Sequence, residues 1–214
     1  MINFLKASDA PSIVPRYRVA VVVAGAWLIA GTVAAEPPPT SRVPIVIDSA
    51  LATIDDATNT ADFTSISVTQ GGTRITAEKA HATDVQSKNS RWTFTGRVTI
   101  TSEQRGSLWA DQAILEYRDG ALDRIVATGV PVRFEQRHTD SGRAEHGQAD
   151  EITYEARQAT VRLRGHPHIS AGSGLEMSAA MFLYRVRDGT LQAYSDNGAP
   201  AVHIVTKPTA SAVP

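Results

Sequence analysis

The 214-residue sequence contains no cysteine, which excludes structural disulfides, cysteine–zinc sites and cysteine nucleophiles. Aromatic residues are few, at 6% of the chain. Neither sign of charge dominates, because 21 Lys and Arg residues stand against 22 Asp and Glu residues and the formal net charge is -1. A nucleic-acid binder would carry a basic face. The even charge therefore argues against that class.

Catalytic and metal-binding motifs are missing as well. The chain has no Gly-x-Ser-x-Gly elbow and no phosphate-binding glycine loop. His166 and His168 are the closest pair of histidines, but no third ligand with zinc-site spacing accompanies them. The acidic pairs Asp55-Asp56 and Asp150-Glu151 would point to opposite faces of a strand, whereas acid–base catalysis needs carboxylates that converge. We expect a protein that is not an enzyme and has no metal or cofactor.

The N-terminal segment predicts export from the cytoplasm. Positive charges at Lys6, Arg16 and Arg18 precede an uncharged apolar run from residue 19 to 35, which ends in small residues. This arrangement is typical of a secretory signal peptide, and we assign it to residues 1–35, followed by a proline-rich linker over 36–44. The alternative is an uncleaved membrane anchor, although the run is shorter than the roughly 20 residues that span a bilayer.

Residues 45–205 have the pattern of a β domain, and residues 206–214 read as a disordered tail. Short runs such as Val98-Thr99-Ile100 and Val161-Arg162-Leu163 alternate apolar and polar residues, the period of a strand with one buried face. Turn signals such as Asp119-Gly120 separate the runs. The run from Leu175 to Val186 also fits a helix, but we interpret it as two strands because it falls in a repeat.

The repeat has a period of roughly 30 to 37 residues and consists of an alternating strand, a turn and a short alanine-rich strand. Repeats of this kind stack edge to edge and leave open edges at both ends. The candidate edge strands contain apolar residues suited to docking another strand, namely Ile45 and Ile47 in the first and Val202 and Ile204 in the last. A closed sandwich that absorbs both edges is the alternative.

Several segments resemble a known family. They are Phe94-Thr95-Gly96-Arg97-Val98-Thr99-Ile100 followed by Leu108-Trp109-Ala110-Asp111, then Gly129-Val130-Pro131-Val132-Arg133-Phe134-Glu135-Gln136, and finally Gln192-Ala193-Tyr194-Ser195-Asp196-Asn197-Gly198. In order and spacing they are similar to the OstA-like domain, which builds the periplasmic bridge protein of lipopolysaccharide export. The stretch from about residue 51 to 80 departs from that pattern and reads as an extra repeat.

The resemblance implies an all-β fold, a twisted, V-shaped β-jelly roll open at both ends. It implies a periplasmic protein that shields the acyl chains of lipopolysaccharide in an apolar groove. The implied partners are lipopolysaccharide, the inner-membrane-anchored and outer-membrane transport subunits reached through the edge strands, and further copies of the chain joined head to tail. Nucleic acid is not expected as a partner.

The expected groove residues come from two sources. Ile45, Phe134 and Tyr154 match positions that face lipid in the family. Strand alternation adds Phe94, Ile152, Val161 and Leu163 to the same apolar side. Three alternatives remain: the inner-membrane-anchored subunit of the same pathway, a structural β-repeat adaptor whose apolar face is a filled core, and an envelope enzyme acting on sugars, for which converging carboxylates are not evident.

Overall fold

The computed structural model describes residues 44–103, 106–137, 144–171, 174–195 and 202–206. These residues form a 14-stranded sheet in which all paired strands are antiparallel. The strands are β1 (Ile45–Asp48), β2 (Leu51–Asp55), β3 (Thr60–Gln70), β4 (Thr73–Thr83), β5 (Arg91–Ser102), β6 (Gly106–Arg118), β7 (Ala121–Arg137), β8 (Ala144–Glu155), β9 (Thr160–Arg164), β10 (His168–Ala171), β11 (Leu175–Ala179), β12 (Met181–Arg185), β13 (Thr190–Tyr194) and β14 (Val202–Thr206).

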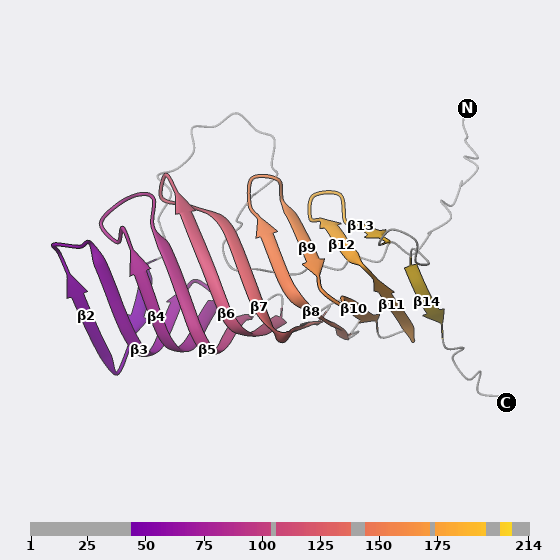
Figure 1. Ribbon diagram of the computed structural model, residues 1–214, viewed down its shortest axis with the longest axis horizontal. Helices are drawn as coiled ribbons and strands as arrows, with labels where there is room; N and C mark the ends of the chain where they lie inside the picture. The colour runs from indigo at the N-terminus through magenta and orange to yellow at the C-terminus, as the bar shows by residue number, and fades with distance from the viewer. Residues whose placement is uncertain (1–43, 104–105, 138–143, 172–173, 196–201, 207–214) are drawn as a thin grey trace, which may run out of the picture.

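The sheet is folded over on itself into two arms that share their central strands. The long strands β3 to β8 run through both arms, and shorter strands complete each arm. In the β1 arm the order is β1-β3-β4-β5-β6-β7-β8-β10-β11-β14. In the β2 arm, β2 pairs with the other half of β3, and β9, β12 and β13 follow β8. Figure 1 shows the strands lying across a long molecule, with β2 and β14 at opposite ends.

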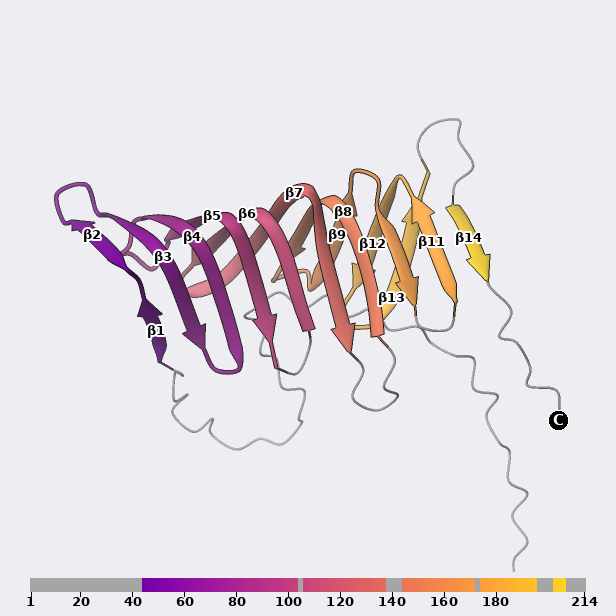
Figure 2. The same ribbon diagram turned by 90° about the horizontal axis from the view of Figure 1, so that it is seen from below.

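The strands bend where their pairing slips. Register shifts interrupt four consecutive strand pairs, between Thr76/Lys79, Thr95/Val98, Trp109/Gln112 and Thr128/Val132. An extra unpaired residue in one strand kinks the ladder and increases its twist. Because these irregularities lie side by side, the whole sheet turns along one line, the vertex between the arms. The curled strands are visible in both ribbon views (Figures 1 and 2).

A recurring Ala–acid dipeptide supports this vertex. Three copies lie at the vertex: Ala77-Glu78, Ala110-Asp111 and Ala149-Asp150. The alanines are buried, whereas each acid contacts the neighbouring strand. The backbone N–H of Val130 donates to Asp111 Oδ2 at 3.1 Å. Asp150 Oδ2 lies 3.0 Å from His166 Nδ1, and Glu78 lies 2.6 Å from Arg97 Nε. The acids therefore tie together residues beside each bend.

The architecture confirms the predicted all-β jelly roll. The helix-like run from Leu175 does form two strands, β11 and β12. The stretch predicted as an extra repeat forms β2, β3 and most of β4, and it extends both arms. It also joins the interior, since the Phe63 ring stacks on Trp92 at 5.7 Å and Trp92 on Phe94 at 6.1 Å between ring centroids.

The predicted signal peptide and nearly all of the linker lie outside the described residues, and so does most of the C-terminal tail. Their assignments, and the domain boundaries drawn from them, stay predictions. Within the described ranges the chain contains no helix long and apolar enough to cross a membrane.

Candidate functional site

The inner faces of the two arms form one apolar interior along the length of the molecule. In the β2 arm, paired strands align Phe63, Ala80, Phe94, Ala113, Ala127, Ile152, Leu163, Phe182 and Ala193 in one row. In the β1 arm, a row runs through Val68, Ile75, Ile100, Leu108, Phe134, Gly147, Ile169, Met177 and Ile204. Apolar residues of both rows belong to the same buried cluster.

Most of the predicted groove residues lie in this interior. Phe94, Ile152, Tyr154, Val161 and Leu163 belong to the β2 arm, and Phe134 belongs to the β1 arm. All six are buried. The structure therefore brings them together from both arms. Ile45 lies apart from them, on β1 at the end of the β1 arm, where it is 54% exposed.

The predicted edge strands do lie at the two ends of the β1 arm. β1 pairs only with β3, and β14 pairs only with β11, among the described strands. Ile47 is the register partner of Val68, and Ile204 is the partner of Met177. Because partners in a ladder share a face, these edge residues continue the inner row. The apolar interior therefore runs out to exposed apolar side chains at both ends.

The interior is filled by the protein's own side chains. The ring of Phe134 covers Gly147, where a Cβ atom would come within 2.6 Å of ring atom Cζ. A Cβ there would also lie 2.6 Å from the carbonyl oxygen of His168 on β10. A glycine is thus required under the ring. Strand alternation places these residues on one face of the sheet, but it does not reveal that they are packed against one another.

Two polar side chains lie within the apolar interior and were missed at the level of sequence. Gln136 on β7 and Glu145 on β8 are register partners, and they are 7% and 6% exposed. Gln136 is two residues beyond Phe134 and therefore shares its face. The two-residue spacing between Phe134 and Gln136 indicated that the glutamine lies on the inner face. In the sequence, however, Gln136 was interpreted only as part of a strand motif.

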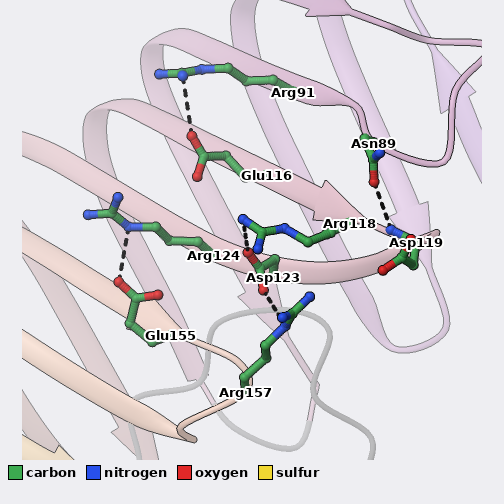
Figure 3. A network of polar contacts seen from close by, with 9 residues as sticks. All are labelled: Asn89, Arg91, Glu116, Arg118, Asp119, Asp123, Arg124, Glu155 and Arg157. Carbon is green, nitrogen blue, oxygen red and sulfur yellow. Dashed lines mark hydrogen bonds and ion pairs between the residues drawn. The ribbon is translucent and has the colours of Figure 1, made fainter.

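Polar contacts elsewhere are structural. Figure 3 shows ion pairs at one end of the β2-arm strands, where Asp123 lies 3.2 Å from Arg118 and 2.9 Å from Arg157. Cross-strand pairs join Arg91 to Glu116 and Arg124 to Glu155, each at 3.2 Å. The alternation of charges leaves no concentrated positive site in the network drawn. Nearby, burial raises the pKa of the Tyr117 hydroxyl.

The acidic and histidine pairs noted in the sequence do not form a site. Asp55 begins an exposed turn, where the backbone N–H groups of Thr58 and Ala57 donate to its carboxylate and lower its pKa. His166 contacts Asp150, whereas His168 Nδ1 lies 3.1 Å from Ser178 Oγ. Across the described residues, no group of three His, Cys, Asp or Glu side chains is placed to hold a metal ion.

Together these features define an open β-jelly roll with an apolar interior. A family model described as "LptA/(LptD N-terminal domain) LPS transport protein" matches residues 79–190. That stretch covers more than half of the chain and runs from β4 into β13. The chain belongs to this family of lipopolysaccharide transport proteins, which is not an enzyme family.

The fold is also that of a solved member of the pathway. It is similar to LptH of Pseudomonas aeruginosa, described as the LptA-homologous periplasmic component of the lipopolysaccharide transport device, with a TM-score of 0.50 and 16% sequence identity. The likeness covers 79% of this chain and 100% of LptH. A search of curated protein sequences gave no match. β2 and β3 lie before the stretch matched by the family model.

Proposed function

We propose that this protein is a periplasmic carrier that holds the acyl chains of lipopolysaccharide between its two arms and joins other transport subunits through its ends. The observation that carries the proposal is the inner apolar face, which is continuous through both arms and ends in exposed apolar residues. Family membership and the likeness to a periplasmic component support the ligand and the compartment.

The chemistry of the ligand matches that face. Acyl chains in water cost about 25 cal/mol per Å² of exposed apolar surface. An interior lined by Phe94, Phe134, Ile152 and Leu163 removes that surface from water without a covalent step. Tyr154 belongs to the same lining and is buried among apolar residues. We assign these residues, with Val161, to lipid contact once the arms separate.

The ends suit strand addition. On β1, Ile45, Val46 and Ile47 are exposed, and on β14 Ile204 is exposed. An edge strand offers unpaired backbone groups to a partner strand, and its side chains select the register. Because Ile47 and Ile204 continue the inner row, a partner docked at either end would extend the apolar path. The partners would be the membrane-bound subunits or a second copy of the chain.

Photo-crosslinking tests the ligand. A photoreactive amino acid replaces Phe134 or Tyr154 in cells, and Arg133 serves as the matched control because it is next to Phe134 but exposed on the outer face. We expect lipopolysaccharide to be trapped at the two inner positions and not at the control. Absence of lipid at both inner positions would refute the groove assignment.

A structural adaptor is the second candidate, and it is favoured by one observation: all six inner groove residues are buried in the structure without lipid. In an adaptor this core would stay closed. The same crosslinking experiment separates the two, because a permanently filled core traps no lipid. The anchored-subunit alternative is tested by the intact mass of the exported protein, which we expect to begin at Glu36.

A further inference from the structure

Gln136 and Glu145 occupy a distinct place in the interior. Along β7, Val132, Phe134 and Gln136 are successive residues on the inner face, leading away from the bulge at the vertex. Gln136 is thus the outermost of the three. Glu145 is its partner on β8, and Ala171 on β10 is the next residue across the sheet. The pair marks the edge of the apolar lining nearest the strand ends.

Burial of the Gln136 side chain calls for a hydrogen-bond donor. A buried polar group without a partner has lost its hydrogen bonds to water without replacing them, which is destabilising. The Oε1 atom of Gln136 is fully buried and has no hydrogen-bond partner among the described residues. This atom can only accept a hydrogen bond. Glu145 lies beside Gln136 as its register partner on β8 and has a polar interaction of its own. The position therefore presents one unsatisfied acceptor next to an apolar surface.

From this we infer that Gln136, next to Glu145, forms a polar subsite for the lipid, in which Gln136 Oε1 accepts a hydrogen bond from an amide N–H or hydroxyl group that lies beside the acyl chains. The inference rests on the proposed function and deepens it. Acyl chains packed against Phe134 would bring the polar atoms at their heads two residues further along β7, to Gln136.

Two synthetic probes test the subsite. One is a glucosamine with an amide-linked β-hydroxyacyl chain, and the other is a glucose with the corresponding ester-linked chain that lacks the hydroxyl group. Both offer an acyl chain of the same length and the same sugar hydroxyl groups, but only the first, donor-bearing probe presents an amide N–H and a β-hydroxyl next to the chain. Affinity for the full exported protein is measured by displacement of a fluorescent lipid. Each probe is kept below its own critical micelle concentration.

For the wild-type protein we expect the donor-bearing probe to bind about 10-fold more tightly, the scale of one or two hydrogen bonds. Gln136→Leu should abolish this preference while leaving affinity for the ester probe within about twofold. Gln148→Leu is the matched control, because Gln148 is an exposed glutamine on the outer face of β8. It should retain the preference.

Gln136→Met provides a second variant of similar length without the amide acceptor, in case the branched leucine disturbs folding. A preference that persists in the folded Leu or Met variant would overturn the subsite and indicate that water alone satisfies Gln136. Equal binding of both probes by the wild-type protein would also overturn the subsite, while leaving the proposed function standing. Binding of neither probe would overturn the proposed function and the subsite together.

Discussion

Replacing Phe134 with alanine tests whether the interior is a packed core in the lipid-free protein. The ring is 4% exposed, and its register partners are Leu108 on β6 and Gly147 on β8. Gly147 has no side chain that could move into the space left by the ring. Because the cavity cannot collapse from that side, we expect the loss of stability to fall in the range for buried phenylalanine, about 3–5 kcal/mol.

Thermal unfolding followed by circular dichroism measures this loss. For a domain of this size each kcal/mol lowers the midpoint by roughly 2–4 °C, so the expected decrease is about 6–20 °C. Trp109→Ala is the control, since this aromatic residue lies on β6 but is 41% exposed. Its removal should cost about 1 kcal/mol. A decrease of less than about 3 °C for the Phe134 variant would refute the packed interior.

Adding lipid should reduce the loss of stability that Phe134→Ala causes. If acyl chains occupy the interior, they fill the space that Phe134→Ala creates, and ligand binding to the folded state raises its stability. We therefore expect the difference between variant and wild type to shrink when lipopolysaccharide is added. An unchanged difference at saturating lipid would mean that the ligand does not reach Phe134.

Three further predictions concern other parts of the fold. Gly147→Ala should lower the free energy of unfolding by about 1–3 kcal/mol through overpacking, measured by urea denaturation. Gly147→Ser should lower the free energy of unfolding by at least as much, because its Cβ meets the same atoms. Ile45→Lys and Ile204→Lys should weaken end-to-end association without lowering the melting temperature, since charged edge strands resist pairing; sedimentation velocity checks this, and undiminished association would exclude the β1-arm edges as docking sites. Arg157→Ala removes the ion pair between the exposed Arg157 and the largely buried Asp123, which keeps its contact with Arg118. The change in stability should be less than about 1 kcal/mol, and a larger loss in thermal unfolding would show that the network in Figure 3 supports the fold.

Much of the fold could be predicted because strand alternation depends on local sequence. Val161 and Leu163 were placed on one face by period alone, and both are fully buried. The repeat pattern also correctly predicted strands in the run over residues 175–186. The alternation could not reveal how each long strand is divided between two arms. That division depends on bulges at Thr128/Val132 and equivalent places, where pairing with neighbours, not local pattern, sets the bend.

The candidate site was predicted less completely. Apolar residues at Phe94, Phe134 and Ile152 were identified as facing a common interior, and the structure brings them together. Gln136 and Glu145 were not, since a glutamine and a glutamate near a turn look like ordinary surface residues in one sequence. Their burial follows from register across β7 and β8, which no local pattern encodes. The acids at the vertex were overlooked, because the same Ala–acid dipeptide also occurs elsewhere in the sequence, as in Ala61-Asp62.

A filled interior also bears on how a carrier can release its cargo. An open hydrated groove would gain the whole benefit of apolar burial when lipid entered, and lipid would then leave slowly. In the proposed carrier, lipid would have to displace contacts that the inner residues already make with one another, so only the surplus over that packing would contribute to affinity. The apolar cost of lipid in water is still avoided. If the protein acts as the proposed carrier, an interior that closes on itself would hold lipid against water but offer little resistance to its transfer into the interior of a neighbouring subunit.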